Sequence, residues 1–297
     1  MDAGAPVLGG FSESFVDTVD GLKLYTRDYE PLLPQTGAPV ICLHGLTRNS
    51  RDFETVAPRI AALGRRVIAP DMRGRGRSDY DQDPAHYVPT VYAQDVLTLL
   101  DKLEISEAVF LGTSMGGIIT MVVSALAPNR VAAAVLNDIG PRLKTEGLTR
   151  IASYVGRTPP IDAWEQAVAA VRGLAEPVYP ARADDAAFWD TFTRRLFRQR
   201  EDGKFVPDYD ANIALAFSDP ETATPVDMTP LFKALAAKPV LSVRGALSDL
   251  FGPDIVVYMQ SLKTDMEAVE VPDVGHAPIL DEPAAWDPIL DFLARVK

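Results

Sequence analysis

One serine of this chain, Ser114, has neighbours that could make its hydroxyl group a nucleophile. It is the middle residue of a Gly-Thr-Ser-Met-Gly segment at 112–116, between an apolar run at 108–111 and an apolar segment at 118–127. This pattern predicts a buried strand, a tight turn and a helix, and such a turn has room only for small residues beside the serine. Ser114 would then lie at a helix N-terminus, where unpaired N–H groups favour developing negative charge. The chemistry expected of such a serine is attack on a carbonyl carbon.

A serine nucleophile needs a base that removes its proton, and the histidines of the chain favour one candidate. The histidines are His44, His86 and His276, and only His276 lies far downstream of the serine. It follows a short segment at 266–271 that is typical of an edge strand, and the glycine and proline residues around it predict a loop. We therefore expect His276 to be the general base.

Two acidic residues could orient the imidazole ring of that histidine, and the sequence leaves both open. Asp249 follows an aliphatic run at 239–243, with room for one helix and one strand before His276. Asp138 follows an earlier apolar run at 131–136, and it also lies at the expected carboxyl end of a strand, where open α/β sheets place their chemistry. Asp249 is favoured because an acid one strand and one helix before the histidine is the usual order. The other reading of Asp138 is a turn residue before Gly-Pro.

The negative oxygen that forms when a serine attacks a carbonyl group needs N–H donors. One donor is expected from Met115, the residue after the serine, and a second from Leu46, in the His-Gly turn that follows the expected strand at 40–43. His44 is expected to brace that turn through hydrogen bonds to the backbone, not to act as a second base. Cys42 is expected to be a small buried residue of the strand.

Together, these segments resemble the α/β-hydrolase fold family, in the subgroup that has a helical cap. The resemblance covers nearly the whole chain and includes a segment at 71–78 that is similar to the family's Asp-x-Arg-Gly-x-Gly-x-Ser pattern. It implies a mostly parallel eight-stranded sheet flanked by helices, and a serine hydrolase that uses Ser114, Asp249 and His276 without a cofactor. The glycines of the 71–78 segment do not indicate a dinucleotide site, because the third glycine of that fingerprint is missing.

The order of the expected elements divides the chain into a core and an inserted cap. Strands alternate with helices at both ends of the chain, whereas the middle part contains helices, loops and many aromatic residues. We expect the core at residues 1–141 and 236–297 and the helical cap, or lid, at 142–235, with a turn or short hairpin at 202–207. A lid over a hydrolase sheet excludes water, and its aromatic residues are expected to form much of an apolar pocket.

The composition excludes several classes of protein. The chain has 297 residues, of which 47% are hydrophobic, yet no apolar stretch is long enough to cross a bilayer, and the first ten residues show no signal-peptide pattern. A formal net charge of −12 opposes binding to nucleic acid or to an anionic membrane surface. The single cysteine rules out an internal disulfide, and no His/Cys cluster has metal-ligand spacing. We expect a cytoplasmic, metal-free protein that acts on a small molecule; its oligomeric state is not readable.

The expected activity is hydrolysis of a small, largely apolar carboxylic ester or lactone through an acyl-enzyme. One alternative is hydrolysis of a carbon–carbon bond in a vinylogous diketone produced by ring cleavage, which relatives perform with the same three residue types. Those relatives usually continue the His-Gly turn with glycines, whereas this chain has Leu-Thr-Arg-Asn at 46–49. A second alternative is a non-catalytic member of the fold that binds a small ligand, because a fold does not dictate function. Relatives that release halide or open epoxides use an aspartate in place of Ser114, which excludes their mechanism.

Overall fold

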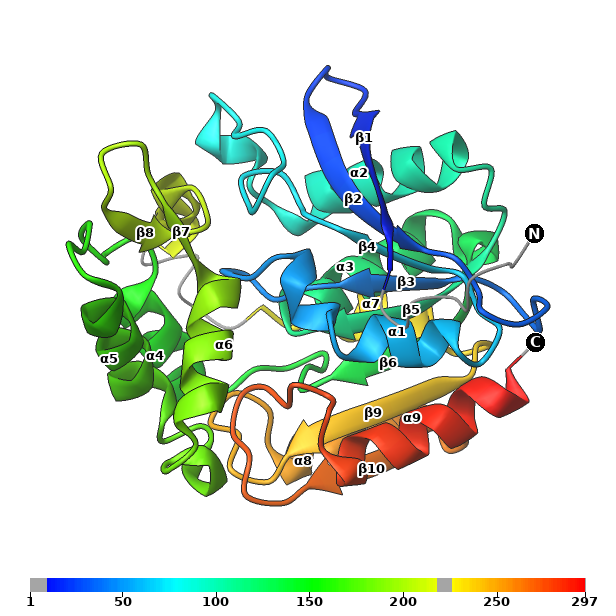
Figure 1. The fold of residues 1–297 in the computed structure, drawn as a ribbon. Coiled ribbons are helices and arrows are strands. Elements are labelled where there is room, and N and C mark those ends of the chain that lie inside the picture. Colours follow the sequence, from blue (N-terminus) through cyan, green and yellow to red (C-terminus); the bar gives the residue numbers. More distant parts are fainter. Residues whose placement is uncertain (1–9, 218–225, 297) are drawn as a thin grey trace, which may run out of the picture.

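The centre of the molecule is one sheet of eight strands, in the order β1-β2-β4-β3-β5-β6-β9-β10 (Figure 1). The structure is a computed structural model, and it describes residues 10–217 and 226–296. β2 runs antiparallel to β1 and to β4, and every other neighbouring pair is parallel, so the expected mostly parallel eight-stranded sheet is confirmed. The strands are β1 (Ser12–Asp17), β2 (Lys23–Tyr29), β3 (Val40–Leu43), β4 (Val67–Pro70), β5 (Ala108–Thr113), β6 (Val131–Asn137), β9 (Val240–Gly245) and β10 (Glu267–Val271).

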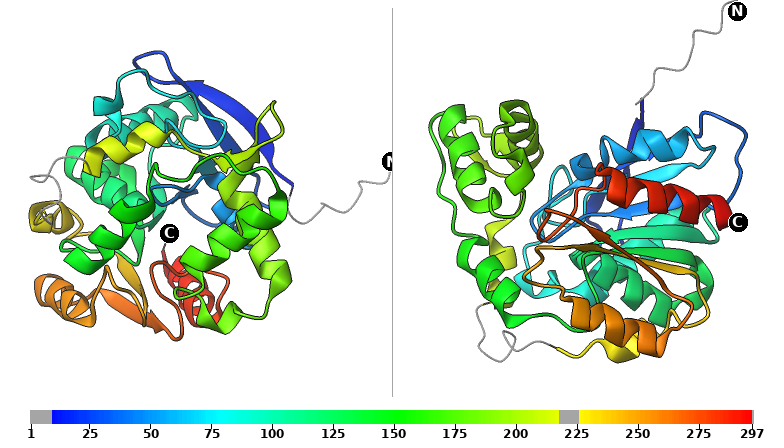
Figure 2. Two further views of the ribbon diagram at one scale, coloured as in Figure 1. Left: turned by 90° about the vertical axis from the view of Figure 1, so that its left-hand side faces the viewer. Right: turned by 90° about the horizontal axis from the view of Figure 1, so that it is seen from below.

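Helices cover both faces of the sheet, which explains why its central strands are apolar along their whole length. Side chains of a strand alternate between the two faces, so Ile41 and Cys42 of β3 lie in different hydrophobic clusters. Helices α2, α3, α7 and α8 pack on the face of Ile41, and helices α1 and α9 pack on the face of the buried Cys42 (Figure 2). None of the helices in the described residues is long and apolar enough to cross a membrane. The helices are α1 (Val56–Ala61), α2 (Pro89–Lys102), α3 (Met115–Leu126), α7 (Thr229–Lys233), α8 (Pro253–Leu262) and α9 (Pro283–Arg295).

The segment between β6 and α7 folds into helices and a small hairpin that lie beyond the carboxyl ends of the parallel strands (Figures 1 and 2). It contains α4 (Thr145–Tyr154), α5 (Trp164–Ala175), α6 (Ala186–Leu196), β7 (Phe197–Gln199) and β8 (Phe205–Pro207). β7 and β8 pair antiparallel, which confirms the expected hairpin at 202–207. Residues 218–225 of the expected cap, like residues 1–9, lie outside the described residues. Short 3-10 helices lie at Ser50–Phe53, Pro84–His86, Pro128–Arg130, Pro180–Arg182 and Ala211–Phe217.

Aromatic side chains pack this segment against the core. The rings of Phe188 and Phe192 on α6 are stacked with their centroids 5.3 Å apart, and Tyr179 meets both of them edge-on. Phe192 and Tyr179 belong to the same buried cluster as Phe53, which follows β3 in the core. The helices beyond the sheet are therefore joined to it by continuous hydrophobic packing.

Candidate active site

Ser114 lies in the turn between β5 and α3, at the carboxyl end of a central strand. β5 ends at Thr113 and α3 begins at Met115, so the expected strand, tight turn and helix are confirmed. The serine has φ 51° and ψ −114°, a conformation that residues with a side chain rarely adopt. The turn packs so closely that a Cβ atom at Gly116 would lie 2.1 Å from the carbonyl oxygen of Leu43. Glycine is therefore required there to hold the serine in this position.

The hydroxyl group of Ser114 is at one end of a row of three hydrogen-bonded side chains. Ser114 Oγ is 2.9 Å from Nε2 of His276, and Nδ1 of the same ring is 2.7 Å from Oδ2 of Asp138. In the tautomer that suits both contacts, Nδ1–H donates to the carboxylate, and Nε2 accepts from the serine hydroxyl. The structure therefore brings Ser114 and His276 together, and the acid beside them is Asp138, the alternative candidate from the sequence.

The loop that carries His276 is held from two sides. On one side, the hydroxyl of Tyr179 donates to the carbonyl oxygen of Ala277 at 2.8 Å. On the other side, the amide group of Asn137, the last residue of β6, donates to the carbonyl oxygen of Pro278 at 2.8 Å. Because these two contacts hold the residues after the histidine, they fix the imidazole ring between the serine and the acid.

Asp138 follows β6 directly, and its side chain is completely buried. Its φ of 54° places it in the left-handed region, where aspartate is more common than most residues. Oδ1 accepts a hydrogen bond from the N–H of Gly245 at 2.7 Å, and Oδ2 accepts one from the hydroxyl of Ser248 at 2.6 Å. With the imidazole N–H, three donors surround the carboxylate and fix its orientation.

The prediction that Asp249 holds the imidazole ring is wrong. Its carboxylate instead accepts two hydrogen bonds from Arg150 of α4, at 2.5 and 2.8 Å, and this guanidinium holds the pKa of Asp249 below its usual range. The physical reason is that β6 and β9 are neighbouring parallel strands, so the acids that follow them reach the same edge of the sheet. Ser248 contacts Asp138 there, and the chain turns the next residue, Asp249, toward α4 instead.

The turn after β3 lies against the serine, as expected for a loop that donates to an oxyanion. A Cβ atom at Gly45 would lie 3.9 Å from Cβ of Ser114. Within residues 10–217 and 226–296, the backbone N–H groups of Leu46 and Met115 donate no hydrogen bond, so both donors are open. Arg75, which is completely buried, connects these two residues: its Nε donates to the carbonyl oxygen of Leu46 at 3.0 Å, and its Nη2 is 3.5 Å from Sδ of Met115. The sequence indicated only a family pattern at residues 71–78 and did not predict this position of Arg75.

His44 braces the turn after β3 through the backbone, as expected. Its Nδ1 is 2.7 Å from the carbonyl oxygen of Gly45, and its Nε2 accepts a hydrogen bond from the N–H of Met72 at 3.0 Å. The ring is completely buried, and this burial lowers the pKa of His44 from 6.5 to about 4. A neutral ring is required, because Nε2 can accept a hydrogen bond only when it carries no proton.

We expect this buried ring to make the fold sensitive to acid. Because the pKa of His44 is lower in the folded chain than in the unfolded chain, the unfolded chain binds the proton more strongly. The contribution of the neutral ring to the free energy of unfolding is fully present above about pH 6.5. It is lost as pH falls toward about 4, and the total loss is on the order of 3 kcal/mol.

Urea unfolding from pH 7.5 to 5 measures this effect in wild type and in His44→Asn, whose amide can still donate and accept. The difference between their free energies of unfolding should shrink as pH falls. His86→Asn, at a half-exposed histidine, is the control and should keep the wild-type pH dependence. A difference between wild type and His44→Asn that stays constant over this range would refute the role of His44.

Ser114 and His276 open into a cavity of about 200 Å³ between the sheet and the helices beyond it. As the sequence predicted, aromatic residues of 142–235 contribute to its wall, which is mostly apolar. The sequence did not predict that the charged side chains of the wall would be three arginines and one carboxylate, Asp52. The arginines are Arg48, Arg150 and Arg195; the aromatic and aliphatic part of the wall includes Phe53, Ile151, Tyr154, Val171, Leu174, Val178, Tyr179, Phe192, Phe197, Tyr209, Ile279 and Leu280.

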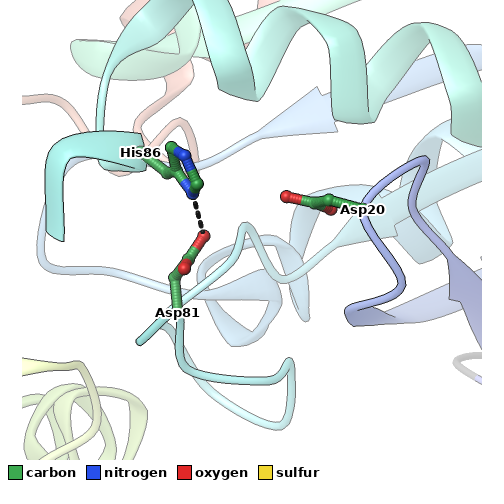
Figure 3. Close-up of side chains that lie close together, drawn as sticks. All are labelled: Asp20, Asp81 and His86. Atoms are coloured by element: carbon green, nitrogen blue, oxygen red, sulfur yellow. Dashed lines mark hydrogen bonds and ion pairs between the residues drawn. The ribbon is translucent and has the colours of Figure 1, made fainter. Parts of the chain in front are cut away.

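A second group of titratable side chains lies elsewhere, and none of them lines the cavity (Figure 3). Asp20, Asp81 and His86 offer atoms within 4.8 Å of one another, and Nδ1 of His86 is 3.0 Å from Oδ2 of Asp81. Arg73 explains this grouping, because its Nη1 donates to Asp20 at 2.8 Å and to Asp81 at 2.6 Å. Asp20 is far from the other two residues in the sequence, so a search for the local spacing of metal ligands could not have found this group. Arg73 already pairs with both carboxylates of this group.

The sheet topology and the serine at the end of its central strand define an α/β hydrolase. A family model described as the alpha/beta hydrolase fold matches residues 38–283. The chain therefore belongs to the α/β-hydrolase family, an enzyme family of hydrolases.

Several relatives are similar to the chain over most of their length. The 3-hydroxybutyrate-oligomer hydrolase of Cupriavidus necator is 35% identical over 281 residues, which cover 91% of this chain and 93% of that protein. The 2-(acetamidomethylene)succinate hydrolase of Mesorhizobium japonicum is 28% identical over 245 residues, 81% of this chain and 82% of that protein. The crystal structure of an alpha/beta hydrolase from Novosphingobium aromaticivorans is 43% identical, covers 98% of this chain and 100% of its own, and superposes with a TM-score of 0.90.

Proposed function

We propose that the protein is a serine hydrolase that cleaves a small carboxylic ester or lactone. The observation that carries this proposal is the row of Asp138, His276 and Ser114 at the cavity wall, with contacts of 2.7 and 2.9 Å. Contacts of this length and order suit an orienting acid, a general base and a nucleophile. We further propose that residues 142–235 act as a cap, because α4, α5 and α6 supply much of the wall above the serine.

In the first half of the proposed reaction, Ser114 Oγ attacks the carbonyl carbon while His276 Nε2 takes the hydroxyl proton. The carboxylate of Asp138 accepts Nδ1–H and stabilises the imidazolium that forms. The carbonyl oxygen becomes negative and receives hydrogen bonds from the N–H groups of Leu46 and Met115. The ester C–O bond then breaks, Nε2 returns its proton to the leaving alcohol, and an acyl-enzyme remains.

In the second half, a water molecule attacks the acyl carbon. His276 takes a proton from this water and passes it to Ser114 Oγ as the acyl–serine bond breaks. The carboxylic acid product leaves, and the hydroxyl group of the serine is restored. Side chains and backbone N–H groups of this chain are sufficient for every proton transfer and every charge in the two steps, so the proposal includes no cofactor.

The relatives favour a narrower second candidate, the hydrolysis of short oligoesters of a small hydroxy acid. One relative is named for 3-hydroxybutyrate oligomers and another for a substituted succinate, and both names denote derivatives of small carboxylic acids. The first of these relatives is similar over 91% of the chain. A cavity of about 200 Å³ suits a substrate of a few such units.

Two alternatives have less support. Carbon–carbon bond hydrolysis is disfavoured because the turn after β3 continues as Leu-Thr-Arg-Asn at 46–49, without the glycines of those relatives. A non-catalytic binding protein needs no base hydrogen-bonded to its serine, yet His276 Nε2 lies 2.9 Å from Ser114 Oγ.

We expect the purified protein to hydrolyse 4-nitrophenyl acetate, 4-nitrophenyl butanoate and the linear dimer of 3-hydroxybutyrate well above the uncatalysed rates. Release of 4-nitrophenol is followed by absorbance, and release of acid from the dimer by titration at constant pH. A vinylogous diketone is the comparison substrate, and EDTA is added in parallel and should change none of the rates. A diketone cleaved much faster than every ester would support the carbon–carbon hydrolase, and no turnover of any substrate would support the binding protein.

A further inference from the structure

We propose that the cavity binds a carboxylate group of the substrate, and that Arg195 and Arg48 are the residues that bind it. This inference rests on the proposed ester hydrolase and names its substrate class. The substrates are esters that carry a free carboxylate besides the bond that is cut, such as esters of hydroxy acids or half-esters of dicarboxylic acids.

The charged side chains of the cavity wall are mostly basic, although the whole chain is acidic. The chain has a formal net charge of −12, with 41 acidic and 29 basic residues. The wall nevertheless contains Arg48, Arg150 and Arg195 and one carboxylate, Asp52. Arg48 pairs with Asp52 and Arg150 pairs with Asp249, so Arg195 is the arginine of the wall that has no described carboxylate within hydrogen-bond distance. In the low-dielectric interior of a protein, a guanidinium group without a close carboxylate partner favours an anionic ligand more strongly than it would in bulk water.

Arg195 is the residue best suited to bind a carboxylate, because its guanidinium group is buried and makes no hydrogen bond within the described residues. It lies in the last turn of α6, and only 7% of its surface is exposed. Its nearest carboxylate is that of Glu54, 3.8 Å from Nε, and the other oxygen of Glu54 is bonded to Arg27 at 2.7 Å. The Nε atom is fully buried with no hydrogen-bond partner. Nη1 and Nη2 also make no hydrogen bond within the described residues, and unlike Nε they are not fully buried, so they are the atoms that a ligand in the cavity can reach.

Arg48 also lines the cavity, and one nitrogen of its guanidinium group has no hydrogen-bond partner within the described residues. Its Nε and Nη2 are bonded to Asp52, at 2.8 and 2.5 Å, whereas its Nη1 donates no hydrogen bond to any described residue. The guanidinium lies 4.4 Å from the ring centroid of Phe192, which is one helical turn before Arg195 on α6. The side chain of Asn49, the next residue, donates to the carbonyl oxygen of Arg195 at 2.9 Å. These contacts place Arg48 and Arg195 on neighbouring parts of the cavity wall, where the turn after β3 meets α6.

The stem of Arg48 lies near Gly45, and Gly45 also lies near Ser114. A Cβ atom at Gly45 would lie 3.4 Å from Cγ of Arg48 and 3.9 Å from Cβ of Ser114. Arg48, Arg195 and Ser114 line the same cavity, so a carboxylate bound by the two arginines can belong to the same small substrate as the ester that Ser114 attacks. Guanidinium groups match carboxylates in shape and charge, and the resulting bonds are among the stronger hydrogen bonds in proteins.

The test uses two substrates that contain the same ester bond. They are 3-acetoxybutanoate, which carries a carboxylate, and its N,N-dimethylamide, which is neutral and of similar size. Values of kcat/KM come from titration of the released acetic acid at pH 7.5. For the wild type we expect kcat/KM to be at least about 10-fold higher for the acid than for the amide, because hydrogen bonds to charged groups contribute more than those to neutral ones.

Two arginines that are neighbours on α6 give a matched pair of variants. Arg195→Gln should reduce the preference for the acid by about 10-fold, mainly through a higher KM for the acid. Arg194→Gln should keep the wild-type preference, because the side chain of Arg194 is 64% exposed and pairs with Asp190. If Arg195→Gln does not fold, Arg195→Lys replaces it and should also weaken the preference, because lysine lacks the planar fork.

A binding measurement on the wild type needs no variant of Arg195. Butanoate should raise the Tm of the protein at millimolar concentration, and butanamide should raise it less. Equal kcat/KM for the acid and the amide, or an unchanged preference in Arg195→Gln, would overturn this inference and leave the ester hydrolase standing. No hydrolysis of either substrate or of 4-nitrophenyl acetate, with butanoate still raising Tm, would instead overturn the proposed function.

Discussion

We expect Ser114→Ala to lower kcat for ester hydrolysis by about 10⁴-fold or more and to leave the fold intact. The alanine removes the only atom that can form the acyl-enzyme, and the residual rate comes from substrate binding and the oxyanion donors. The substitution takes away one hydroxyl whose hydrogen-bond partner is His276, so the free energy of unfolding should change little. Steady-state kinetics with 4-nitrophenyl butanoate and a urea unfolding curve measure the two effects.

A fluorophosphonate probe gives an independent reading of the same serine, because it reacts covalently with an activated serine hydroxyl. Wild type should be labelled, and Ser114→Ala should not. Ser261→Ala is the control, since the hydroxyl of that exposed serine on α8 donates to the carbonyl oxygen of Tyr258, and the variant should keep full labelling. Labelling of Ser114→Ala at the wild-type rate would remove Ser114 from the mechanism.

The fold was predictable from the sequence because its central strands are buried on both faces. Strands of this kind are continuous apolar runs, and the run expected at 40–43 has the same bounds as β3. Element boundaries were harder to predict where the sequence is not a continuous apolar run. The helix after the serine was expected from 118, but α3 begins at Met115, because its first turn consists largely of glycine and helix propensity does not reveal it.

The site was predictable only where chain order determines it. Ser114 and His276 follow from a local motif and from the position of the only downstream histidine. The arginines of the cavity could not be found in this way. Arg48 follows β3, Arg150 is on α4 and Arg195 is on α6, so only the packing of these elements brings their guanidinium groups to one cavity. The negative net charge of the whole chain pointed in the opposite direction.

The carboxylate that contacts the His276 ring is the clearest case in which the sequence left two candidates and the structure shows which one makes the contact. Asp138 and Asp249 follow neighbouring parallel strands, so both lie at the edge of the sheet where the serine is. What separates them is the partner of each carboxylate. Asp138 contacts His276 at 2.7 Å, whereas Asp249 is held by Arg150. Neither partner can be read from residues near the acid in sequence.

Asp138→Asn should therefore lower kcat by about 10⁴-fold, and Asp249→Asn should lower it far less. The amide that Asp138→Asn introduces would present an N–H group to Nδ1 of the imidazole ring. His276 would then take the tautomer in which Nε2 carries the proton, so Nε2 could not accept a proton from Ser114. Asp249→Asn removes a charge that pairs with Arg150, 2.5 Å away at its closest, and leaves the contact between Asp138 and His276 in place. Kinetics with one neutral ester compare the two variants.

The two variants should also differ in stability, and measuring stability distinguishes a loss of catalysis from a loss of folded protein. Asp138 accepts hydrogen bonds from Gly245, Ser248 and His276 in a fully buried site, so its loss should lower the free energy of unfolding more than the loss of the partly exposed Asp249. Kinetics are therefore measured well below the temperature at which either variant unfolds. If Asp249→Asn lost about 10⁴-fold in kcat while Asp138→Asn stayed within about 10-fold of wild type, the hydrogen bond seen here would not be the catalytic one. The acid would then have to reach His276 from β9 in the working enzyme.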